Sequence, residues 1–507
     1  LLAFNQEAYD KHHGDLREGG VLVYDSNALT PPRAPGQIHY PLPLSELAQE
    51  INFLRGKNIV AIGALVKLFG LPHARAEEMV RRQLGRKGRE LLRQNLTALE
   101  TGYGYVEKNV TKADPYKLKA LQRAVDKRLV MSGNQAIALG AIAAGCRFYA
   151  GYPITPATDI MEFLAAQFPR MGGTLIQAED EMAALAMVLG ASFTGQRAMT
   201  ATSGPGFSLM TELLGLASMT EVPAVIVDVQ RAGPSTGMPT KTAQGDLYLA
   251  LRSGHDEGPR IVLAPTSVED CFYQTINAFN LAERYQMPVI LLSDQSLSHR
   301  VETIPPFRLD EVKLSQRLLA PLDGGDGYER YAVTDTGVSP MALPGMAGGQ
   351  YTAEGLEHEP SGVPNYEPEL HRIMMEKRFR KLETAARELA GMDMVRRYGD
   401  PEAEIGLIGW GSTEGAVREA VERAQERGLK VAALYPKVLN PLPVEAIQEF
   451  AAPLKAVIVP EINYTGQFAD LLRARLGIEA IRLNKYEGIP FTAGEIYRKI
   501  EEVAEDA

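Results

Sequence analysis

The sequence contains only two cysteines, Cys146 and Cys271, among its 507 residues. A [4Fe–4S] cluster is held by four cysteine thiolates, and a four-cysteine zinc site needs as many, so this chain can build neither on its own. Two cysteines are also too few for the disulfide framework that is typical of small secreted proteins. We therefore expect the protein to be cytoplasmic.

Other features that would define a protein class are also missing. No stretch reaches about 18 uninterrupted apolar residues, so the sequence predicts no membrane-spanning helix, and no signal-peptide pattern opens the chain. The eight histidines form no H-E-x-x-H motif, and we expect no metal site. The 53 basic and 63 acidic residues leave a net charge of −10, which argues against nucleic acid as a partner.

The remaining composition is that of an ordinary globular protein, with 45% hydrophobic and 23% charged residues. A length of 507 residues predicts two to four domains. The distribution of apolar runs divides the chain into three folded units, 1–110, 128–310 and 396–507, and a linker with one helix, 311–395.

The second unit alternates apolar and helix-favouring segments, which is typical of a parallel, doubly wound α/β sheet. Ligand-binding loops of such sheets lie at the carboxyl ends of the strands. The third unit repeats this alternation on a smaller scale, and the first combines one buried strand, 20–25, with one amphipathic helix, 74–99, docked on a sheet. Expected strands of the second and third units are 147–151, 174–177, 198–202, 223–229, 288–292, 404–409, 431–435 and 456–459. Expected helices are 180–190, 207–218 after the Ser-Gly-Pro-Gly turn at 203–206, 370–389 and 413–427.

Three loops at predicted strand ends carry groups suited to chemistry. In loop 151–156, two prolines flank Thr155 and restrict its backbone. Segment 177–181 places acidic residues at a helix N-terminus. An alternative interpretation is that they only stabilise the helix through its dipole and have no other role. Loop 231–242 contains two cations among hydroxyls and suits a carboxylate ligand, although a surface loop with incidental polar residues is an alternative interpretation.

Two motifs resemble other enzyme classes and fit them poorly. Residues 233–237 match the G-x-S-x-G elbow of hydrolases, but Pro239 disfavours the helix that must follow the nucleophilic serine. Residues 409–415 contain a glycine-rich turn whose spacing is one residue too long for a dinucleotide loop. A glycine-rich turn without a nucleotide is the better interpretation.

Five stretches together resemble the alpha subunit of 2-oxoacid:ferredoxin oxidoreductases, most closely of the 2-oxoglutarate type. They are 152–156, 202–212, 231–246, 355–358 and 463–467. The resemblance covers residues 128–507. It implies a pyrimidine-type domain of thiamine diphosphate enzymes followed by a transketolase C-terminal-like domain. Residues 1–110 resemble an α/β gamma domain fused ahead of alpha. We expect this domain to be incomplete, because a full gamma domain would begin well before Leu1 with a glycine-rich segment that this sequence does not contain.

The resemblance also implies roles for individual residues. The pyrimidine half of such a site supplies one carboxyl group to ring nitrogen N1′, which promotes proton removal from C2 of the thiazolium. The family pattern assigns this carboxyl to Glu181, with Glu179 as the fallback or as a helix cap. Thr155 is expected to contact the substrate and, with Glu181, to be catalytic. Further expected contacts are Tyr152, Pro153, Ile154 and Pro156 for the cofactor, and Arg231, Ser235, Thr236, Thr240 and Lys241 for the substrate.

The reaction implied is the conversion of 2-oxoglutarate and coenzyme A to succinyl-CoA, CO2 and reduced ferredoxin, or its carbon-fixing reverse. A beta subunit would share the thiamine diphosphate, supply Mg2+ and a [4Fe–4S] cluster, and form an (alpha–beta)2 assembly that meets ferredoxin. Pyruvate and other 2-oxoacids remain alternative substrates. A scaffold that docks a catalytic subunit remains the alternative without catalysis.

Overall fold

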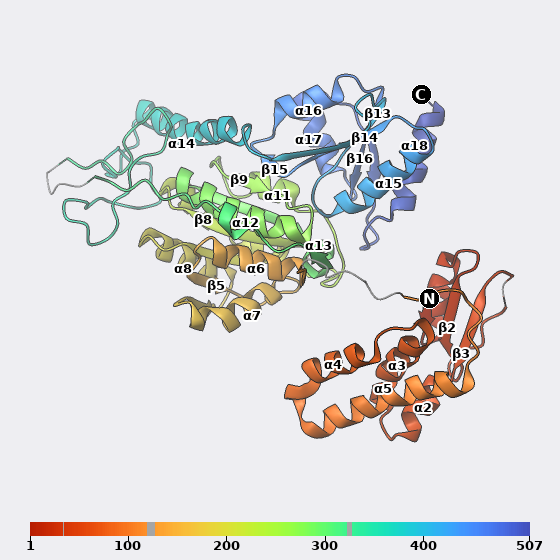
Figure 1. Cartoon of the computed structure of the whole chain (residues 1–507). Coiled ribbons are helices and arrows are strands. Elements are labelled where there is room, and N and C mark those ends of the chain that lie inside the picture. Colours follow the sequence, from red (N-terminus) through yellow and green to blue (C-terminus); the bar gives the residue numbers. More distant parts are fainter. Residues whose placement is uncertain (34, 119–126, 322–326, 507) are drawn as a thin grey trace. The chain divides into compact units, whose positions relative to one another are not determined.

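Two stretches of the chain fold around separate cores, with the boundary between residues 126 and 127. A computed structural model describes residues 1–33, 35–118, 127–321 and 327–506 (Figure 1). No helix in these ranges is long and apolar enough to cross a membrane.

The first unit contains a small parallel sheet in the order β1-β2-β3. The buried strand predicted at 20–25 is confirmed as β2. The single helix predicted at 74–99 is wrong, because the chain turns at Gly85–Gly88, where Gly88 has a φ of +117° that few other residues adopt. The elements are β1 (Leu2–Ala3), α1 (Gln6–His12), β2 (Val21–Asp25), β3 (Ile38–Leu42), α2 (Leu44–Glu50), α3 (Lys57–Phe69), α4 (His73–Leu84) and α5 (Arg89–Asn109).

Helix α5 packs against helices α2, α3 and α4. Glycines make the closest approach possible: a Cβ on Gly63 would lie 2.0 Å from the Leu99 carbonyl oxygen, and one on Gly102 would lie 1.8 Å from that of Val60. Helix-on-helix packing therefore replaces much of the helix-on-sheet packing that the amphipathic pattern predicted.

The second unit is built on a seven-stranded sheet in the order β15-β9-β10-β8-β7-β5-β6. Every neighbouring pair is parallel except β15 with β9, so the predicted doubly wound parallel sheet is confirmed. Its strands are β5 (Phe148–Gly151), β6 (Thr174–Gln177), β7 (Ala198–Thr202), β8 (Ala224–Gln230), β9 (Ile261–Leu263), β10 (Pro288–Asp294) and β15 (Val438–Asn440).

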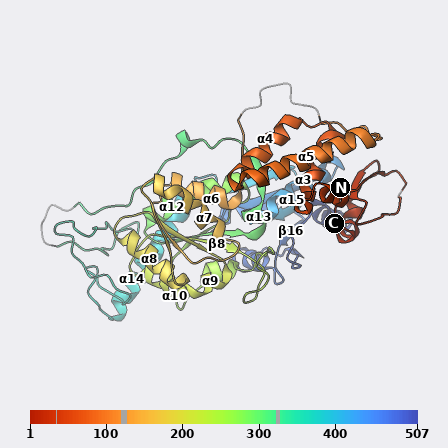
Figure 2. The same cartoon turned by 90° about the horizontal axis from the view of Figure 1, so that it is seen from below.

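Helices cover both faces of this sheet (Figure 2). Along β8, Val225 and Val227 pack into the core formed with α6, α7 and α12, while Ile226 packs into the core formed with α8 to α11. This alternation buries both faces, as a parallel sheet requires. The helices are α6 (Gly133–Ala143), α7 (Thr158–Gln167), α8 (Glu181–Phe193), α9 (Gly204–Leu209), α10 (Thr211–Met219), α11 (Leu247–Arg252), α12 (Val268–Tyr285) and α13 (Gln295–His299); β4 (Leu129–Ser132) pairs with β11 (Val301–Ile304).

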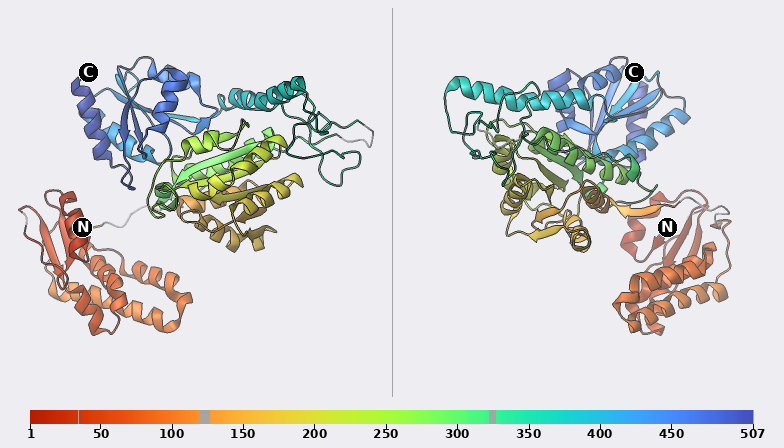
Figure 3. Two further views of the ribbon diagram at one scale, coloured as in Figure 1. Left: turned by 180° about the vertical axis from the view of Figure 1, so that it is seen from behind. Right: turned by 60° about the vertical axis from the view of Figure 1, so that its left-hand side comes forward.

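The C-terminal segment, residues 395–506, forms a five-stranded sheet in the order β12-β14-β13-β16-β17 (Figure 3). Helices α15 and α18 share one core with this sheet, and α16 and α17 contribute to the core that also holds α8 to α11. The antiparallel strand β12 was not predicted. The elements are β12 (Val395–Gly399), β13 (Ile405–Ile408), α15 (Glu414–Glu426), β14 (Val431–Pro436), α16 (Val444–Ala451), β16 (Ala456–Glu461), α17 (Gln467–Leu476), β17 (Ile481–Asn484) and α18 (Ala493–Asp506).

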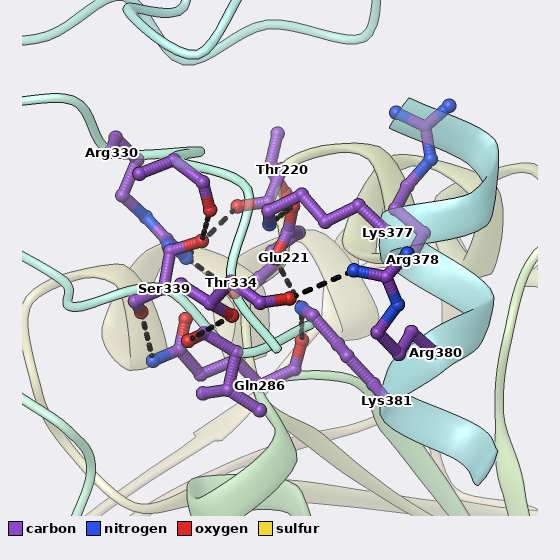
Figure 4. A network of polar contacts seen from close by, with 12 residues as sticks. Thr220, Glu221, Gln286, Arg330, Thr334, Ser339, Lys377, Arg378, Arg380 and Lys381 are labelled. Atoms are coloured by element: carbon purple, nitrogen blue, oxygen red, sulfur yellow. Dashed lines mark hydrogen bonds and ion pairs between the residues drawn. The ribbon is translucent and has the colours of Figure 1, made fainter. Parts of the chain in front are cut away.

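The helix expected in the linker is confirmed as α14 (Pro368–Leu389). Its lysines pair with a buried carboxylate, as Figure 4 shows. Lys377 Nζ lies 2.6 Å from Glu221 Oε1, and Lys381 pairs with the other carboxylate oxygen. Arg330 donates a 2.7 Å hydrogen bond to the Glu221 carbonyl. Together these contacts fasten the linker to the turn before β8.

Candidate cofactor and substrate site

The three loops singled out from the sequence all begin where strands of the parallel sheet end. β5 ends at Gly151, β6 at Gln177 and β8 at Gln230. Because these strands are parallel, the three loops emerge at the same edge of the sheet, which is the edge that binds ligands in this class of fold.

Glu181 is the first residue of α8, and the residue is only 6% exposed. Asp180 caps the helix, since its side chain accepts a 2.7 Å hydrogen bond from the Ala183 amide. Glu179 is exposed and is not the N-cap residue. The cap therefore falls on Asp180, and Glu181 has its carboxylate available for another purpose.

The carboxylate of Glu181 lies against a glycine of the loop that follows β7. A Cβ on Gly206 would lie 2.5 Å from Glu181 Oε1 and 2.1 Å from Thr202 Oγ1, so only glycine fits there. Among the described residues, no group donates a hydrogen bond to this carboxylate, and its oxygens are not fully shielded from solvent. Most buried polar groups are bonded. A carboxylate that lies mostly inside the fold, is unbonded by its own chain and is still reached by solvent suits a ring nitrogen of a bound cofactor.

The loop after β5 presents Tyr152 and Thr155 on the surface and buries Pro156. The Asn134 side chain donates a 2.7 Å hydrogen bond to the Pro156 carbonyl, and the Thr155–Pro156 peptide bond is cis. The Thr155 hydroxyl is thus displayed by a backbone that is anchored from α6.

Arg231 joins this loop to the loop after β8. Its Nη1 donates to the Thr155 carbonyl at 2.7 Å and its Nη2 to the Thr236 carbonyl at 2.9 Å. Burial lowers the pKa of the guanidinium. Since both terminal nitrogens hold backbone carbonyls, the observed geometry gives Arg231 a positioning role between the two loops.

Lys241 is exposed, and in the described parts of the chain it forms no ion pair with a carboxylate. Ser235, Thr236 and Thr240 are exposed on the same loop. The structure therefore joins the Thr155 loop to the 231–242 loop through Arg231, and it places Glu181 beside Thr202 and Gly206.

The hydrolase interpretation fails on the local geometry. After Ser235 the chain continues as an irregular loop and reaches α11 only at Leu247. A nucleophile elbow needs a helix directly after its serine. Residues 233–237 form a turn in which the Met238 amide donates to the Ala232 carbonyl at 2.8 Å.

Sequence reasoning missed two carboxyl groups near these loops. Asp228 on β8 is fully buried, and neither of its carboxyl oxygens has a hydrogen-bond partner among the described residues. Burial and the charge of Asp246 raise the pKa of Asp228 well above its usual range, and burial raises that of Asp246 to about 6. An aspartate inside the apolar run 223–229 was the signal available in the sequence.

Family models match three parts of the chain. Residues 139–377 match the model described as pyruvate flavodoxin/ferredoxin oxidoreductase, thiamine diphosphate-binding. Residues 1–105 match pyruvate ferredoxin/flavodoxin oxidoreductase, and residues 403–488 match core domain II of pyruvate:ferredoxin oxidoreductase. The main sheet and its loops thus belong to a thiamine diphosphate-binding domain.

Curated relatives agree on a narrower family. The 2-oxoglutarate oxidoreductase subunit KorA of Mycobacterium tuberculosis is 34% identical over 99% of this chain and 80% of its own length. The 2-oxoacid:ferredoxin oxidoreductase subunit alpha of Saccharolobus solfataricus is 35% identical, over 89% and 72%. The 2-oxoglutarate synthase subunit KorA of Methanothermobacter thermautotrophicus is 38% identical, over 73% and 95%. The chain belongs to the 2-oxoacid:ferredoxin oxidoreductase family as an alpha-type subunit.

A solved structure resembles nearly the whole chain. It is the 2-oxoglutarate:ferredoxin oxidoreductase from Magnetococcus marinus with 2-oxoglutarate, coenzyme A and succinyl-CoA bound. The TM-score is 0.91 and the sequence identity 44%, over 99% of this chain and 87% of that one.

Proposed function

We propose that this chain is the alpha subunit of a thiamine diphosphate-dependent 2-oxoglutarate:ferredoxin oxidoreductase. The complex would convert 2-oxoglutarate and coenzyme A to succinyl-CoA, CO2 and reduced ferredoxin, or run the reverse, carbon-fixing reaction. The observation that carries this proposal is the match over 99% of the chain to an enzyme that was solved with 2-oxoglutarate and succinyl-CoA bound.

The open, buried carboxylate of Glu181 fits the pyrimidine half of thiamine diphosphate. Glu181 would share a proton with ring nitrogen N1′, which makes it a catalytic residue. The backbone and side chains of the loop after β5 would line the cofactor, with Thr155 beside the reacting centre. When bound, the cofactor supplies the electron sink for decarboxylation. The loop residues assigned to it are Tyr152, Pro153, Ile154 and Pro156.

Lys241 would hold a carboxylate of the 2-oxoacid, because it is exposed and forms no ion pair with a carboxylate among the residues described. Charge-assisted hydrogen bonds of this kind are worth about 1.5–3 kcal/mol. Arg231 would fix the position of Thr155 relative to the 231–242 loop. In this way it would contribute to substrate binding through the residues that it positions. The hydroxyls of Ser235, Thr236 and Thr240 complete the set of donors.

The electrons must leave through another polypeptide, which we assign as a beta subunit with Mg2+ and a [4Fe–4S] cluster. Both cysteines of this chain are buried, and burial raises the pKa of the Cys146 thiol to about 12, so neither is a thiolate ready to bind iron. Exposed apolar side chains on the loops after β5 and β8, and in the C-terminal segment, suit contact with a partner in an (alpha–beta)2 assembly. These are Tyr152, Met238, Tyr464, Tyr486 and Ile489.

Steady-state assay of the copurified alpha–beta complex tests the proposal. We expect coenzyme A-dependent reduction of ferredoxin or viologen with 2-oxoglutarate, at a kcat/KM well above that with pyruvate or branched-chain 2-oxoacids. Preference for pyruvate would overturn the assigned substrate, and a complex inactive on every 2-oxoacid would support the scaffold alternative.

A further inference from the structure

We propose that the turn at residues 486–489, in the C-terminal segment, sets the position of the substrate-binding Lys241, and that Gly488 is a specificity-determining residue. The inference rests on the proposed function, since it needs Lys241 to hold the distal carboxylate of 2-oxoglutarate, which pyruvate lacks. It assigns a part in substrate choice to a segment that carries none of the residues predicted from the sequence.

The backbone of Gly488 lies directly against the stem of Lys241. A Cβ on Gly488 would lie 2.9 Å from Lys241 Cβ, 3.3 Å from its Cγ and 3.1 Å from Met238 Cε. Next to this contact, the Thr242 amide donates to the Gly488 carbonyl at 3.3 Å. Gly488 is buried and has a φ of +75°, so glycine satisfies both the backbone and the space.

A second attachment follows three residues after Lys241. Gln244 is fully buried, and its backbone and side-chain polar groups all bond to the C-terminal segment. The Gln244 amide donates to the Ile462 carbonyl at 2.7 Å, and its Oε1 accepts from the Ile462 amide at 3.1 Å. Gln244 Nε2 donates to the Trp410 carbonyl at 2.9 Å, and its carbonyl accepts from Asn463 Nδ2 at 2.9 Å.

The segment that receives these bonds is itself braced. Glu461 accepts hydrogen bonds from the Phe468 amide at 2.8 Å and from Asn463 Nδ2 at 3.0 Å. Lys485, just before the turn, has its Nζ 2.6 Å from Glu495 Oε1, and its amide donates to the Glu461 carbonyl at 2.9 Å. The 486–489 turn is therefore anchored to β16 and α18 where it presses on Lys241.

These contacts hold the backbone of Lys241 and the first two carbons of its side chain. On the loop side, the Lys241 amide donates to the Met238 carbonyl at 3.0 Å and the Lys241 carbonyl accepts from the Ala232 amide at 3.0 Å. A methyl group at position 488 must displace the first carbons of the Lys241 side chain. The shifted ammonium then forms a weaker hydrogen bond to the substrate carboxylate.

Gly488→Ala, compared with Gly477→Ala, separates this effect from backbone strain. Gly477 lies in the same segment and also has a positive φ, +69°, but a Cβ there meets no atom within 4 Å. In the alpha–beta complex we expect Gly488→Ala to raise the KM for 2-oxoglutarate about tenfold with kcat within about twofold of wild type, and to change the KM for pyruvate less. We expect Gly477→Ala to leave both KM values unchanged.

The effect must also pass through Lys241. In the background of Lys241→Ala, adding Gly488→Ala should raise the KM no further, because the stem that Gly488 positions is gone. Gln244→Asn, which shortens the side chain, provides a second variant with the same expected rise in KM should Gly488→Ala not fold.

The outcomes separate the two proposals. A wild-type complex without activity on 2-oxoglutarate overturns the proposed function. An active wild type in which Gly488→Ala and Gly477→Ala behave alike, or in which Gly488→Ala adds its full effect to Lys241→Ala, overturns the role of Gly488 alone. If Gly488→Ala does not fold and only Gln244→Asn can be measured, an unchanged KM for 2-oxoglutarate in Gln244→Asn overturns the proposed positioning of Lys241 by the C-terminal segment.

Discussion

Glu181 is a buried carboxylate that the described chain leaves without a hydrogen-bond donor, beside a glycine that makes room for it. A largely buried carboxylate that its own chain leaves unbonded, but that solvent still reaches, is open to a hydrogen-bond donor from a ligand. A ring nitrogen of the cofactor would complete this hydrogen bond, and we therefore propose that Glu181 takes part in cofactor activation.

Glu181→Gln should lower kcat at least 100-fold, because an amide cannot hold the proton shared with N1′ and acid–base groups contribute about 10²–10⁴-fold. Bound thiamine should change far less than kcat. The matched control is Glu179→Gln, which alters an exposed glutamate two residues earlier and should keep full activity. Normal turnover by Glu181→Gln would remove this residue from the mechanism.

Lys241→Ala should raise the KM for 2-oxoglutarate about 10- to 100-fold, since one charge-assisted hydrogen bond of about 1.5–3 kcal/mol is lost. Lys241→Arg keeps the charge and should recover part of the affinity. Initial rates over a range of 2-oxoglutarate concentrations measure both. An unchanged KM in the alanine variant would show that the lysine does not bind substrate.

Helix α14 is held to the rest of the fold by buried charges. It buries Lys377 and Lys381, one helical turn apart, against the single carboxylate of Glu221. Arg330 donates a hydrogen bond to the backbone carbonyl of the same glutamate. Three cations face one anion in a fully buried setting. Burial therefore lowers the pKa of Lys381 to about 7, although Glu221 acts in the opposite direction.

This gives a stability that depends on pH. Lys381 titrates near 7 in the folded chain and near 10.4 when unfolded, so the unfolded state binds more protons between these values. Below pH 7, Lys381 is charged in the folded chain and the full cost of burying that charge destabilises the fold. As the pH rises above 7 this cost decreases, so the free energy of unfolding increases by about 1 kcal/mol per pH unit.

Comparison with Lys381→Met isolates this contribution. From pH 7 to 9, the melting temperature of wild type should rise relative to that of Lys381→Met. Lys455→Met, at an exposed lysine, should follow wild type throughout. Parallel melting curves for wild type and Lys381→Met across this range would contradict the assignment.

The sequence predicted best those elements that local pattern determines. Strands 174–177 and 198–202 match β6 and β7 to the residue, because each is a short β-favouring run bounded by turns. β15 was missed since its three residues gain their partner only from β9, nearly 180 positions away. The break at Gly85–Gly88 was missed because helical periodicity continues across it.

The candidate site divides in the same way. Thr155 and Lys241 stand in loops, and Glu181 opens a helix, that follow recognisable strands, so the sequence could single out these segments. Gln244 and Gly488 could not be found, because their importance lies in contacts between segments more than 160 residues apart. Spacing along the chain carries no sign of such contacts.

At the scale of the whole chain, we propose that this protein holds half of an active site. The isolated chain, the partner subunit and their complex can each be analysed for iron and thiamine and assayed with 2-oxoglutarate, coenzyme A and a viologen acceptor. We expect no iron and no turnover in the isolated chain, with iron, thiamine and activity in the complex. Full activity of this chain alone would contradict it.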